Sequence, residues 1–417
     1  MKLSEELSWR GFVNQTTLTD PTLLDKRKFI FYWGVDPSSD SMTVGNLATA
    51  MMVKHFIKHG HKAVLLVGGA TGMIGDPDGK TEERKLKTLE TIAANKKAIV
   101  SQYKNLFAGL NITIVDNYDW FKNYNYLAFL RDVGKHVTMR QMLGREFVQS
   151  RLGEQGSGIS YAEFSYVLMQ AYDFLYLHNN FNVDMQVCGS DQWGNSIAGV
   201  DLIRRMTGDV VEVWSSPLVV NPLTGAKFGK SEDGAVWLDA NKTSPTSFHQ
   251  FWVNTDDQNV EYYLKIYTEL SPTEVALVMK EQADSPKTRP AQFKLADEVT
   301  AIVHGRKAAA RARRLSSFIT GITNVGQANQ NDLDDLRQEI PCVRINIRQT
   351  ISDVLIESKL AISRTAAKRL IEDGAIYLNG ARIDRDKFND SDFTNNRLMI
   401  RRGKAYKDSA MVELESR

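Results

Sequence analysis

Two stretches of this sequence have the composition of a site that binds the phosphates of a nucleotide. The first runs from Gly34 to Asn46, and the second is Lys-Phe-Gly-Lys-Ser at residues 227–231. A turn that leads from a strand into a helix presents free backbone N–H groups to an anion, and Gly45 would let a flat ligand approach the backbone. Lysines in a polar loop can close on transferring phosphates. Taken alone, the first stretch is equally an ordinary turn and the second a solvated loop.

Three further polar clusters could bind a small ligand or a sugar. Residues 189–195 follow an expected strand and could contact a ribose, although a helix cap would have the same sequence. Tyr166, Gln170 and Asp173 share one helix face, where polar groups need partners from a ligand or from a core hydrogen-bond network. Residues 68–77, with Lys80 and Arg84 beyond them, resemble a weak phosphate loop without its Gly-Lys-Ser/Thr ending.

The elements around these clusters predict an α/β fold. Apolar runs predict buried strands, and apolar stripes at helical spacing predict helices between them. The order strand, helix, strand favours βαβ units, and therefore a doubly wound, Rossmann-like parallel sheet in a domain over 1–245, with ligands at the carboxyl ends of the strands. The expected strands are 29–35, 63–67 and 185–188, and the expected helices are 43–60, 161–177 and 191–205.

The remainder of the chain divides into three parts. Residues 246–320 are predicted to form a helical domain, and 321–342, rich in Asn, Asp, Gln and Gly, a linker. Residues 343–417 predict a small α+β domain with helices over 351–359 and 364–373. Ser363 is the expected N-cap of the second helix and Gly374 its stop. Asn379-Gly380 predicts a tight hairpin turn.

Composition excludes several classes of protein. The 417 residues carry a net charge of +2, so any nucleic-acid surface must be a local patch. Cys188 and Cys342 lie far apart with no Cys/His cluster near them, which argues against structural zinc and a disulfide framework and suits a reducing cytosol. The mixed-charge N-terminus does not resemble a signal or transit peptide, and no apolar run suggests a membrane span. The expected location is cytoplasmic.

The five clusters together resemble the bacterial-type tyrosyl-tRNA synthetases. The first two are similar to the His-x-Gly-His and Lys-Met-Ser-Lys-Ser motifs of class I aminoacyl-tRNA synthetases. The other three, in this order and spacing, are similar to the tyrosyl enzymes rather than to their tryptophanyl relatives. The resemblance includes Trp9-Arg10-Gly11 and a C-terminal module like the S4 RNA-binding fold, and it covers nearly the whole chain except the linker.

The resemblance implies an activity and its partners. The family activates L-tyrosine with ATP and Mg²⁺ to tyrosyl-adenylate, releases pyrophosphate, and transfers tyrosine to the 3′ end of tRNA(Tyr). It implies a homodimer, an anticodon-binding role for 246–320, an S4-like RNA-binding role for 343–417, and no structural zinc. The tyrosine carboxylate is itself the nucleophile, so catalysis needs positioning and donors to developing charge rather than a catalytic histidine or cysteine.

Residue roles follow from the same resemblance. Tyr32 and Asp173 match the pair that holds the phenol hydroxyl, while Asp76, Tyr166 and Gln170 match the α-amino contacts and Gln192 the glutamine near the carboxylate. On the nucleotide side, Gly34 matches the adenine contact, Asp36 the junction of the two substrates, Gly45 the close approach to ATP, and Gly189 and Asp191 the ribose contacts. Lys80, Arg84, Lys227 and Lys230 match the basic residues around pyrophosphate.

The chain departs from the family pattern in its first motif. Thr43 and Asn46 stand where the motif has its two histidines, and Ser38 retains a hydroxyl where threonine is frequent. Asn46 can still donate an N–H, while Thr43 is a short substitute for imidazole. Gly229 replaces the first serine of the second motif, and Trp33 stands where a small residue is common, with an expected effect on ribose contact.

The C-terminal module carries the expected RNA surface. From residue 343 onward there are 15 Lys and Arg against 11 Asp and Glu. Arg364, Lys368 and Arg369 form one expected group and Arg401 and Arg402 another, suited to phosphate contact more than to base readout. Without the S4 resemblance this would be a solvated face. Two alternatives stay open: a nucleotidylyltransferase with the same nucleotide motif, and a non-enzymatic RNA-binding paralogue.

Overall fold

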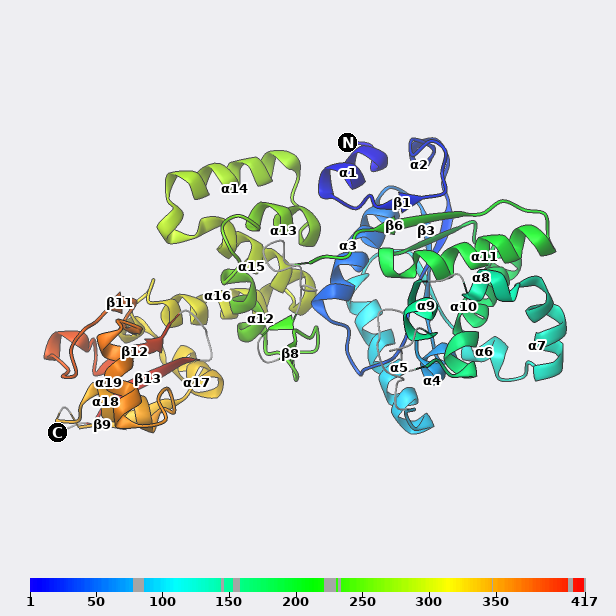
Figure 1. The fold of residues 1–417 in the computed structure, drawn as a ribbon. Coiled ribbons are helices and arrows are strands. Elements are labelled where there is room, and N and C mark those ends of the chain that lie inside the picture. The colour runs from blue at the N-terminus through cyan, green and yellow to red at the C-terminus, as the bar shows by residue number, and fades with distance from the viewer. Residues whose placement is uncertain are drawn as a thin grey trace. The chain divides into compact units, whose positions relative to one another are not determined.

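The computed structural model (Figure 1) describes residues 1–77, 86–143, 146–152, 158–220, 230–231, 234–346, 348–403 and 408–415. The chain forms two compact units. The first is Met1–Asp239 with Lys265–Tyr267, and the second is Ala240–Leu264 with Thr268–Arg417. No helix in the described ranges is both long enough and apolar enough to span a membrane.

A six-stranded sheet forms the centre of the first unit, in the order β1-β6-β5-β2-β3-β4. Strands β2 to β6 run parallel, and the short β1 pairs antiparallel with β6 at the edge. This confirms the predicted doubly wound fold. The strands are β1 (Gln15–Thr16), β2 (Ile30–Val35), β3 (Lys62–Val67), β4 (Ile112–Asp116), β5 (Met185–Gly189) and β6 (Glu212–Ser216).

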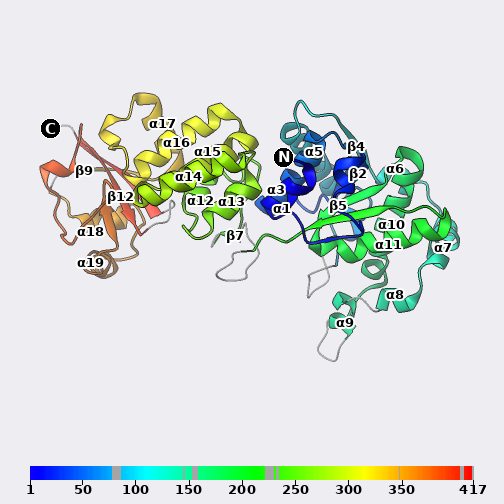
Figure 2. The same ribbon diagram turned by 90° about the horizontal axis from the view of Figure 1, so that it is seen from above.

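Helices cover both faces of this sheet. Successive residues of β2 point to opposite sides, and because they are apolar on both sides, each face must be buried against helices. Phe31 packs on Phe56 of α3 and Trp33 on Tyr103 of α5, whereas Tyr32 packs on Phe174 of α10. Figures 1 and 2 show these layers. The covering helices are α3 (Val44–Lys58), α5 (Leu89–Leu106), α10 (Tyr161–Phe181) and α11 (Trp193–Met206). The shorter helices are α1 (Leu3–Arg10), α2 (Leu23–Lys26), α4 (Thr71–Ile74), α6 (Tyr118–Phe121), α7 (Tyr126–Asp132), α8 (Met139–Leu143) and α9 (Glu146–Leu152).

The order of the strands creates a crevice between β2 and β5. From β2 the chain continues to β3 and β4 on one side, and it returns to β5 on the other side of β2. At such a switch point the loops beyond the two carboxyl ends diverge and leave space for a ligand. The residues that follow β2, beginning with Asp36, and Gly189 at the end of β5 are therefore placed at the same opening.

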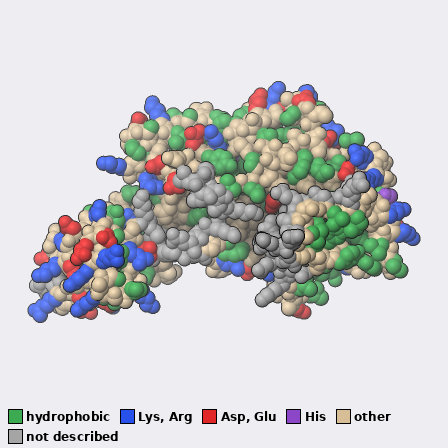
Figure 3. Space-filling model, in the orientation of Figure 1, with side chains coloured by type: hydrophobic (Ala, Val, Ile, Leu, Met, Phe, Trp, Pro, Cys, Tyr) green, Lys and Arg blue, Asp and Glu red, His purple; other side chains and the backbone are tan. Residues whose placement is uncertain are grey.

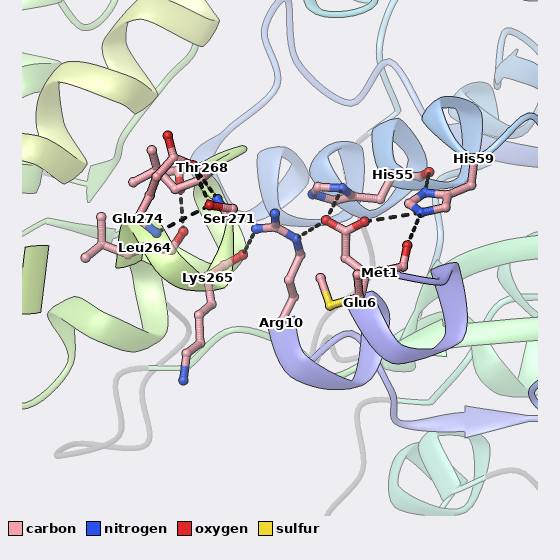
Figure 4. Close-up of polar contacts among 11 residues, drawn as sticks. Met1, Glu6, Arg10, His55, His59, Leu264, Lys265, Thr268, Ser271 and Glu274 are labelled. Carbon is pink, nitrogen blue, oxygen red and sulfur yellow. Dashed lines mark hydrogen bonds and ion pairs between the residues drawn. The ribbon is translucent and has the colours of Figure 1, made fainter. Parts of the chain in front are cut away.

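A buried ionic network joins α1 to α3 (Figure 4). The Arg10 Nε donates to Glu6 Oε1 at 2.9 Å, and the same oxygen lies 3.1 Å from His55 Nδ1. Burial alone would raise the pKa of Glu6, but the hydrogen bonds and charges of His55 and Arg10 outweigh it and lower that pKa to about 2. Arg10 belongs to the Trp9-Arg10-Gly11 stretch that matches the family. It is thus part of a structural contact that anchors α1 to His55, near the C-terminal end of α3.

The second unit combines helices with a small sheet. Its sheet has the order β11-β10-β12-β13-β9, with β9 parallel to β13. The helices are α12 (Pro245–Val253), α13 (Val260–Tyr267), α14 (Pro272–Asp284), α15 (Pro290–His304), α16 (Arg306–Thr320), α17 (Gln330–Glu339), α18 (Ile351–Glu357) and α19 (Arg364–Glu372). The strands are β9 (Cys342–Ile345), β10 (Ile376–Leu378), β11 (Ala381–Arg382), β12 (Arg397–Arg402) and β13 (Ser409–Leu414).

Local signals in the C-terminal module are confirmed. The Ser363 side chain accepts a hydrogen bond from the N–H of Ala366 and caps α19. Asn379 and Gly380 both have positive φ, 47° and 83°, as a two-residue type I′ hairpin turn requires. Gly374, with φ 61°, follows the end of α19 in the left-handed region.

The segment 321–342, predicted to be a linker, is structured. It contains α17, and its apolar residues Val325, Leu333, Leu336 and Ile340 form a buried cluster with α16 and with Met399 and Met411 of the C-terminal sheet. Its polar residues act as caps, since the Asn329 side chain accepts from the N–H of Asp332 at the start of α17. The linker prediction was wrong because helix-capping residues and loop residues are the same amino acids.

Candidate active site

The predicted site residues of the first unit surround one cavity of about 400 Å³. It opens at the switch point between β2 and β5. Fourteen of the predicted residues line it: Tyr32, Gly34, Asp36, Ser38, Thr43, Gly45, Asn46, Asp76, Tyr166, Gln170, Asp173, Gly189, Asp191 and Gln192. Lys80, Arg84 and Lys227 lie outside the described residues. Lys230 begins strand β7 (Lys230–Ser231), which pairs with β8 (Gly234–Ala235), and only its backbone is described.

The Asp173 carboxyl group marks one wall of the cavity and is almost completely buried. Its Oδ2 accepts from Asn117 Nδ2 at 3.0 Å and its Oδ1 from Trp120 Nε1 at 2.8 Å. Burial raises the pKa of Asp173 to about 8, against the lowering effect of these two donors. The Tyr32 hydroxyl, also buried, has no hydrogen-bond partner among the described residues. The wall therefore presents one acceptor-rich group and one hydroxyl, a pair suited to recognising a ligand hydroxyl.

Asn117 and Trp120 are functional candidates that the sequence alone did not reveal. The Asn117 amide accepts from the N–H of Ala70 at 2.7 Å and donates to Thr71 Oγ1 at 2.9 Å, which fixes its orientation toward Asp173. The Trp120 indole stacks on Tyr176 with 4.4 Å between ring centroids. Both residues follow the carboxyl end of β4. That position was the available signal, but β4 itself was not predicted.

The raised pKa of Asp173 predicts a pH-dependent stability. The unfolded chain loses this proton near pH 3.9, whereas the folded protein without ligand holds it up to about pH 8. Stability from this group is therefore complete below pH 3.9 and is lost progressively as the pH rises to about 8, by up to about 1.4 kcal/mol per pH unit. Urea unfolding of wild type and Asp173→Asn at pH 6 and pH 8 measures the difference in slope. Parallel pH profiles for the two proteins would contradict the assignment.

Two further carboxylates in the cavity are held by neighbouring side chains. Asp36 accepts from the Tyr166 hydroxyl at 2.8 Å and from Thr71 Oγ1 at 2.6 Å, and Asp76 accepts from Gln192 Nε2 at 2.6 Å. Burial and the charge of Asp36 raise the pKa of Tyr166, which keeps its phenol protonated as a donor. The anionic side of the cavity is thus oriented in advance, as a site for an α-ammonium group requires.

Two glycines let the backbone approach the carboxylates of Asp36 and Asp191 closely. A Cβ on Gly68 would lie 2.0 Å from Asp36 Oδ1, and one on Gly189 would lie 2.6 Å from Asp191 Oδ1. Any side chain at either position would displace the neighbouring carboxylate.

The Gln170 Oε1 atom on the cavity wall is buried and has no hydrogen-bond partner in the described part of the chain, so it too can accept a hydrogen bond from a ligand.

The two unusual residues of the first motif contact each other. Thr43 is the N-cap of α3, and Asn46 Oδ1 accepts from both Thr43 N at 2.9 Å and Thr43 Oγ1 at 3.0 Å. This capping box uses the hydroxyl proton of Thr43 and the amide oxygen of Asn46. Asn46 itself borders the cavity, so its amide nitrogen is a candidate donor there. Trp33 packs on Tyr103 and Phe107, so its ring fills the core even though the residue borders the cavity.

Comparison with known proteins decides the family. A model described as class I tRNA synthetases (W and Y) matches residues 24–319, and one for the C-terminal domain of tyrosine–tRNA ligases matches 332–407. The chain is 41% identical to the tyrosine–tRNA ligase of Levilactobacillus brevis, over 97% of this chain and 98% of that relative. The chain belongs to the tyrosyl-tRNA synthetase family. The ligase of Staphylococcus haemolyticus is 40% identical over 96% of this chain and 97% of its own.

Solved structures of tyrosyl-tRNA synthetases agree with this assignment. The C-terminally truncated mitochondrial enzyme of Aspergillus nidulans superposes with a TM-score of 0.68 at 31% identity, covering 76% of this chain and 93% of that one. The matches to both family models, which together cover most of the chain, remove the nucleotidylyltransferase alternative. This chain is therefore placed among the class I aminoacyl-tRNA synthetases, which are ligases.

The basic residues predicted to contact RNA have different environments within the synthetase's C-terminal module. Arg364, Lys368 and Arg369 are exposed on α19. Arg401 covers the ring of Tyr377 at 5.3 Å, while Arg402 pairs with Asp408 at 2.7 Å. Adjacent residues of β12 face opposite sides of the sheet, so Arg401 and Arg402 do not form one patch. The helix α19 is the better candidate surface.

Proposed function

We propose that this chain activates L-tyrosine with ATP and transfers it to tRNA(Tyr). The observation that carries the proposal is the cavity itself. Its wall at Asp173 and Tyr32 fits a phenol hydroxyl, and its other wall is the start of α3, where the N–H of Gly45 and the Asn46 amide fit a phosphate. A site with both properties can hold a tyrosine beside a nucleotide.

Chemistry in this cavity requires orientation and charge stabilisation. The tyrosine carboxylate attacks the α-phosphorus of ATP, the bond to the bridging oxygen breaks, and pyrophosphate leaves with the electron pair. Asp36 and Asp76 orient the ammonium group, and the Asn46 amide with the backbone N–H of Gly45 donates to phosphate oxygens. Mg²⁺ enters with ATP and offsets phosphate charge. We assign Lys80, Arg84, Lys227 and Lys230 to the leaving pyrophosphate on the motif resemblance.

We predict that the chain forms tyrosyl-adenylate although Thr43 and Asn46 replace both motif histidines. The motif supplies hydrogen bonds rather than proton transfer, so an amide can substitute for imidazole. Asn46→Ala should lower the single-turnover rate of adenylate formation roughly a hundredfold, about 3 kcal/mol, and leave the Kd of tyrosine unchanged. Quenched-flow at saturating ATP, Mg²⁺ and tyrosine measures the rate. If wild type forms no adenylate, the non-enzymatic RNA-binding alternative is correct.

We further propose that the active form is a homodimer. Large apolar side chains gather over α7 and α10 of the first unit, a patch that Figure 3 shows. Tyr126, Leu127 and Tyr161 are each more than half exposed, and the hydroxyl oxygens of Tyr126 and Tyr161 lie 3.4 Å apart. Contiguous exposed apolar residues are typical of interfaces. Sedimentation velocity of the full chain and of Tyr161→Asp tests the proposal, which a monomeric wild type would overturn.

The cytoplasm remains the proposed location of this activity. Both cysteines are free thiols, Cys188 buried and Cys342 exposed, as expected in a reducing compartment.

A further inference from the structure

Helix α5 holds both ends of the loop that leads from β2 into α3. Asn95 Nδ2 donates to the carbonyl oxygen of Pro37 at 2.9 Å. Gln102 Oε1 accepts from the N–H of Met42 at 2.8 Å, and Gln102 Nε2 donates to Ser41 Oγ at 2.8 Å. Asn95 and Gln102 are seven positions apart and therefore share one helix face. This loop carries Asp36 and Ser38 and ends at Thr43.

The same loop end is hydrogen-bonded to the segment that follows the lysine-rich second motif. Ser41 Oγ accepts from the N–H of Asp239 at 3.1 Å and donates to the carbonyl of Met42 at 2.8 Å. The N–H of Val44 donates to the carbonyl of Val236 and that of Leu238 to the carbonyl of Met42, so Thr43 and Trp237 form an antiparallel bridge. With the bond from Gln102, the Ser41 hydroxyl uses its one donor and both acceptor positions.

Gln102 lies behind the site rather than in it. It is not among the described residues that border the cavity, whereas Ser38, Thr43 and Asn46 are. The Gln102 amide accepts from Met42, just before α3, and donates to Ser41, whose hydroxyl in turn accepts from Asp239. Gln102 thus fixes the contact between the loop before α3 and residues 236–239, which follow the second motif.

We propose that Gln102 is a positioning residue for adenylate formation, holding the start of α3 in place through Ser41, Met42 and the contact with residues 236–239. The proposal rests on the proposed function. It matters in this chain because Thr43 and Asn46 are short and bonded to each other, so the candidate phosphate donors are the Asn46 amide and the backbone N–H of Gly45. A backbone N–H moves only with the helix, and the Asn46 side chain is held by its bonds to Thr43, so neither donor can adjust if the start of α3 shifts. A misplacement of about 1 Å can cost on the order of a hundredfold in rate.

Three substitutions on α5 test the assignment in the full chain. Gln102→Leu leaves an apolar side chain one atom shorter than glutamine and removes both hydrogen bonds. Gln102→Glu keeps the acceptor for Met42 N–H and removes the donor to Ser41, which can then donate instead. Asn105→Leu, on the exposed face of the same helix, is the matched control. The measurements are single-turnover adenylate formation at varied ATP, the Kd of tyrosine, and the urea midpoint.

Gln102→Leu should lower the maximal rate roughly ten- to a hundredfold with little change in the KM of ATP or the Kd of tyrosine. Gln102→Glu should recover part of that rate, and Asn105→Leu should match wild type. In an Asn46→Ala background the effect of Gln102→Leu should shrink, since both act at the start of α3. A wild-type rate for Gln102→Leu, or full additivity with Asn46→Ala, overturns the inference. Wild type without any adenylate would instead overturn the proposed function.

Discussion

Replacing Asp173 with alanine is expected to lower kcat/KM for tyrosine activation by roughly a hundredfold or more. The substitution removes the buried acceptor for the phenol hydroxyl, and leaving buried polar groups without a hydrogen-bond partner costs up to about 3 kcal/mol. A substrate hydroxyl would then enter a wall whose polar atoms include Tyr32 Oη and the N–H groups of Asn117 and Trp120. Tyrosine-dependent exchange of pyrophosphate into ATP measures the effect.

Selectivity should change together with rate. A site built to hydrogen-bond a hydroxyl rejects the analogue that lacks it, and tyrosyl-tRNA synthetases are themselves the standard example of this rule. The preference for tyrosine over phenylalanine should therefore fall in Asp173→Ala. Tyr32→Phe is the matched variant, since it removes one hydroxyl and leaves the carboxyl group. If folded Asp173→Ala activates tyrosine at the wild-type rate, the tyrosine pocket is misassigned.

Reversing two charges on α19 is expected to weaken tRNA charging without affecting adenylate formation. Lys368 and Arg369 are exposed, so Lys368→Glu with Arg369→Glu removes two candidate phosphate contacts. Each lost contact should reduce the slope of log affinity against log salt by about 1, and the affinity loss should be larger at low salt. The KM of tRNA between about 50 and 200 mM salt measures it.

The control reverses the same amount of charge elsewhere in the module. Arg348 and Lys387 are exposed and lie outside α19, so Arg348→Glu with Lys387→Glu tests the overall charge. Equal tRNA affinity for the two double variants would remove the specific role from α19. Charge reversal is preferable to truncation before residue 343, because Met399 and Met411 complete the buried cluster around α17 and deletion would expose it.

Much of the fold follows from local rules that a sequence displays directly. Strands β2, β3 and β5 agree with their predicted ranges to within one residue at each end, because a short apolar run bounded by turn residues has few alternatives. Ser363 and the Asn379-Gly380 turn behave as expected because an N-cap and a type I′ turn each depend on a few adjacent residues.

The composition of the candidate site was also accessible from the sequence. In a doubly wound sheet the ligand site lies at the carboxyl ends of the strands, so residues after β2 and β5 had to converge whatever the details of packing. The polar face of α10 indicated a ligand for a separate reason, because buried polar groups need hydrogen-bond partners. Fourteen of the predicted residues accordingly border one cavity.

The pairing of those residues was decided by tertiary structure. Asn117 and Trp120 reach Asp173 from 56 and 53 positions away, and Gln102 reaches Met42 from 60 positions away. No periodicity or motif encodes such distances, because which donor meets which acceptor depends on how α5, β4 and α10 pack on the sheet. The same holds for segment 321–342, whose apolar residues have a buried environment only once the C-terminal sheet is in place. The sequence by itself determined which functional groups are present and at which edge of the sheet they lie. Packing decided that the Asp173 carboxyl is buried, which donors reach it, and that Gln102 of α5 holds the loop before α3.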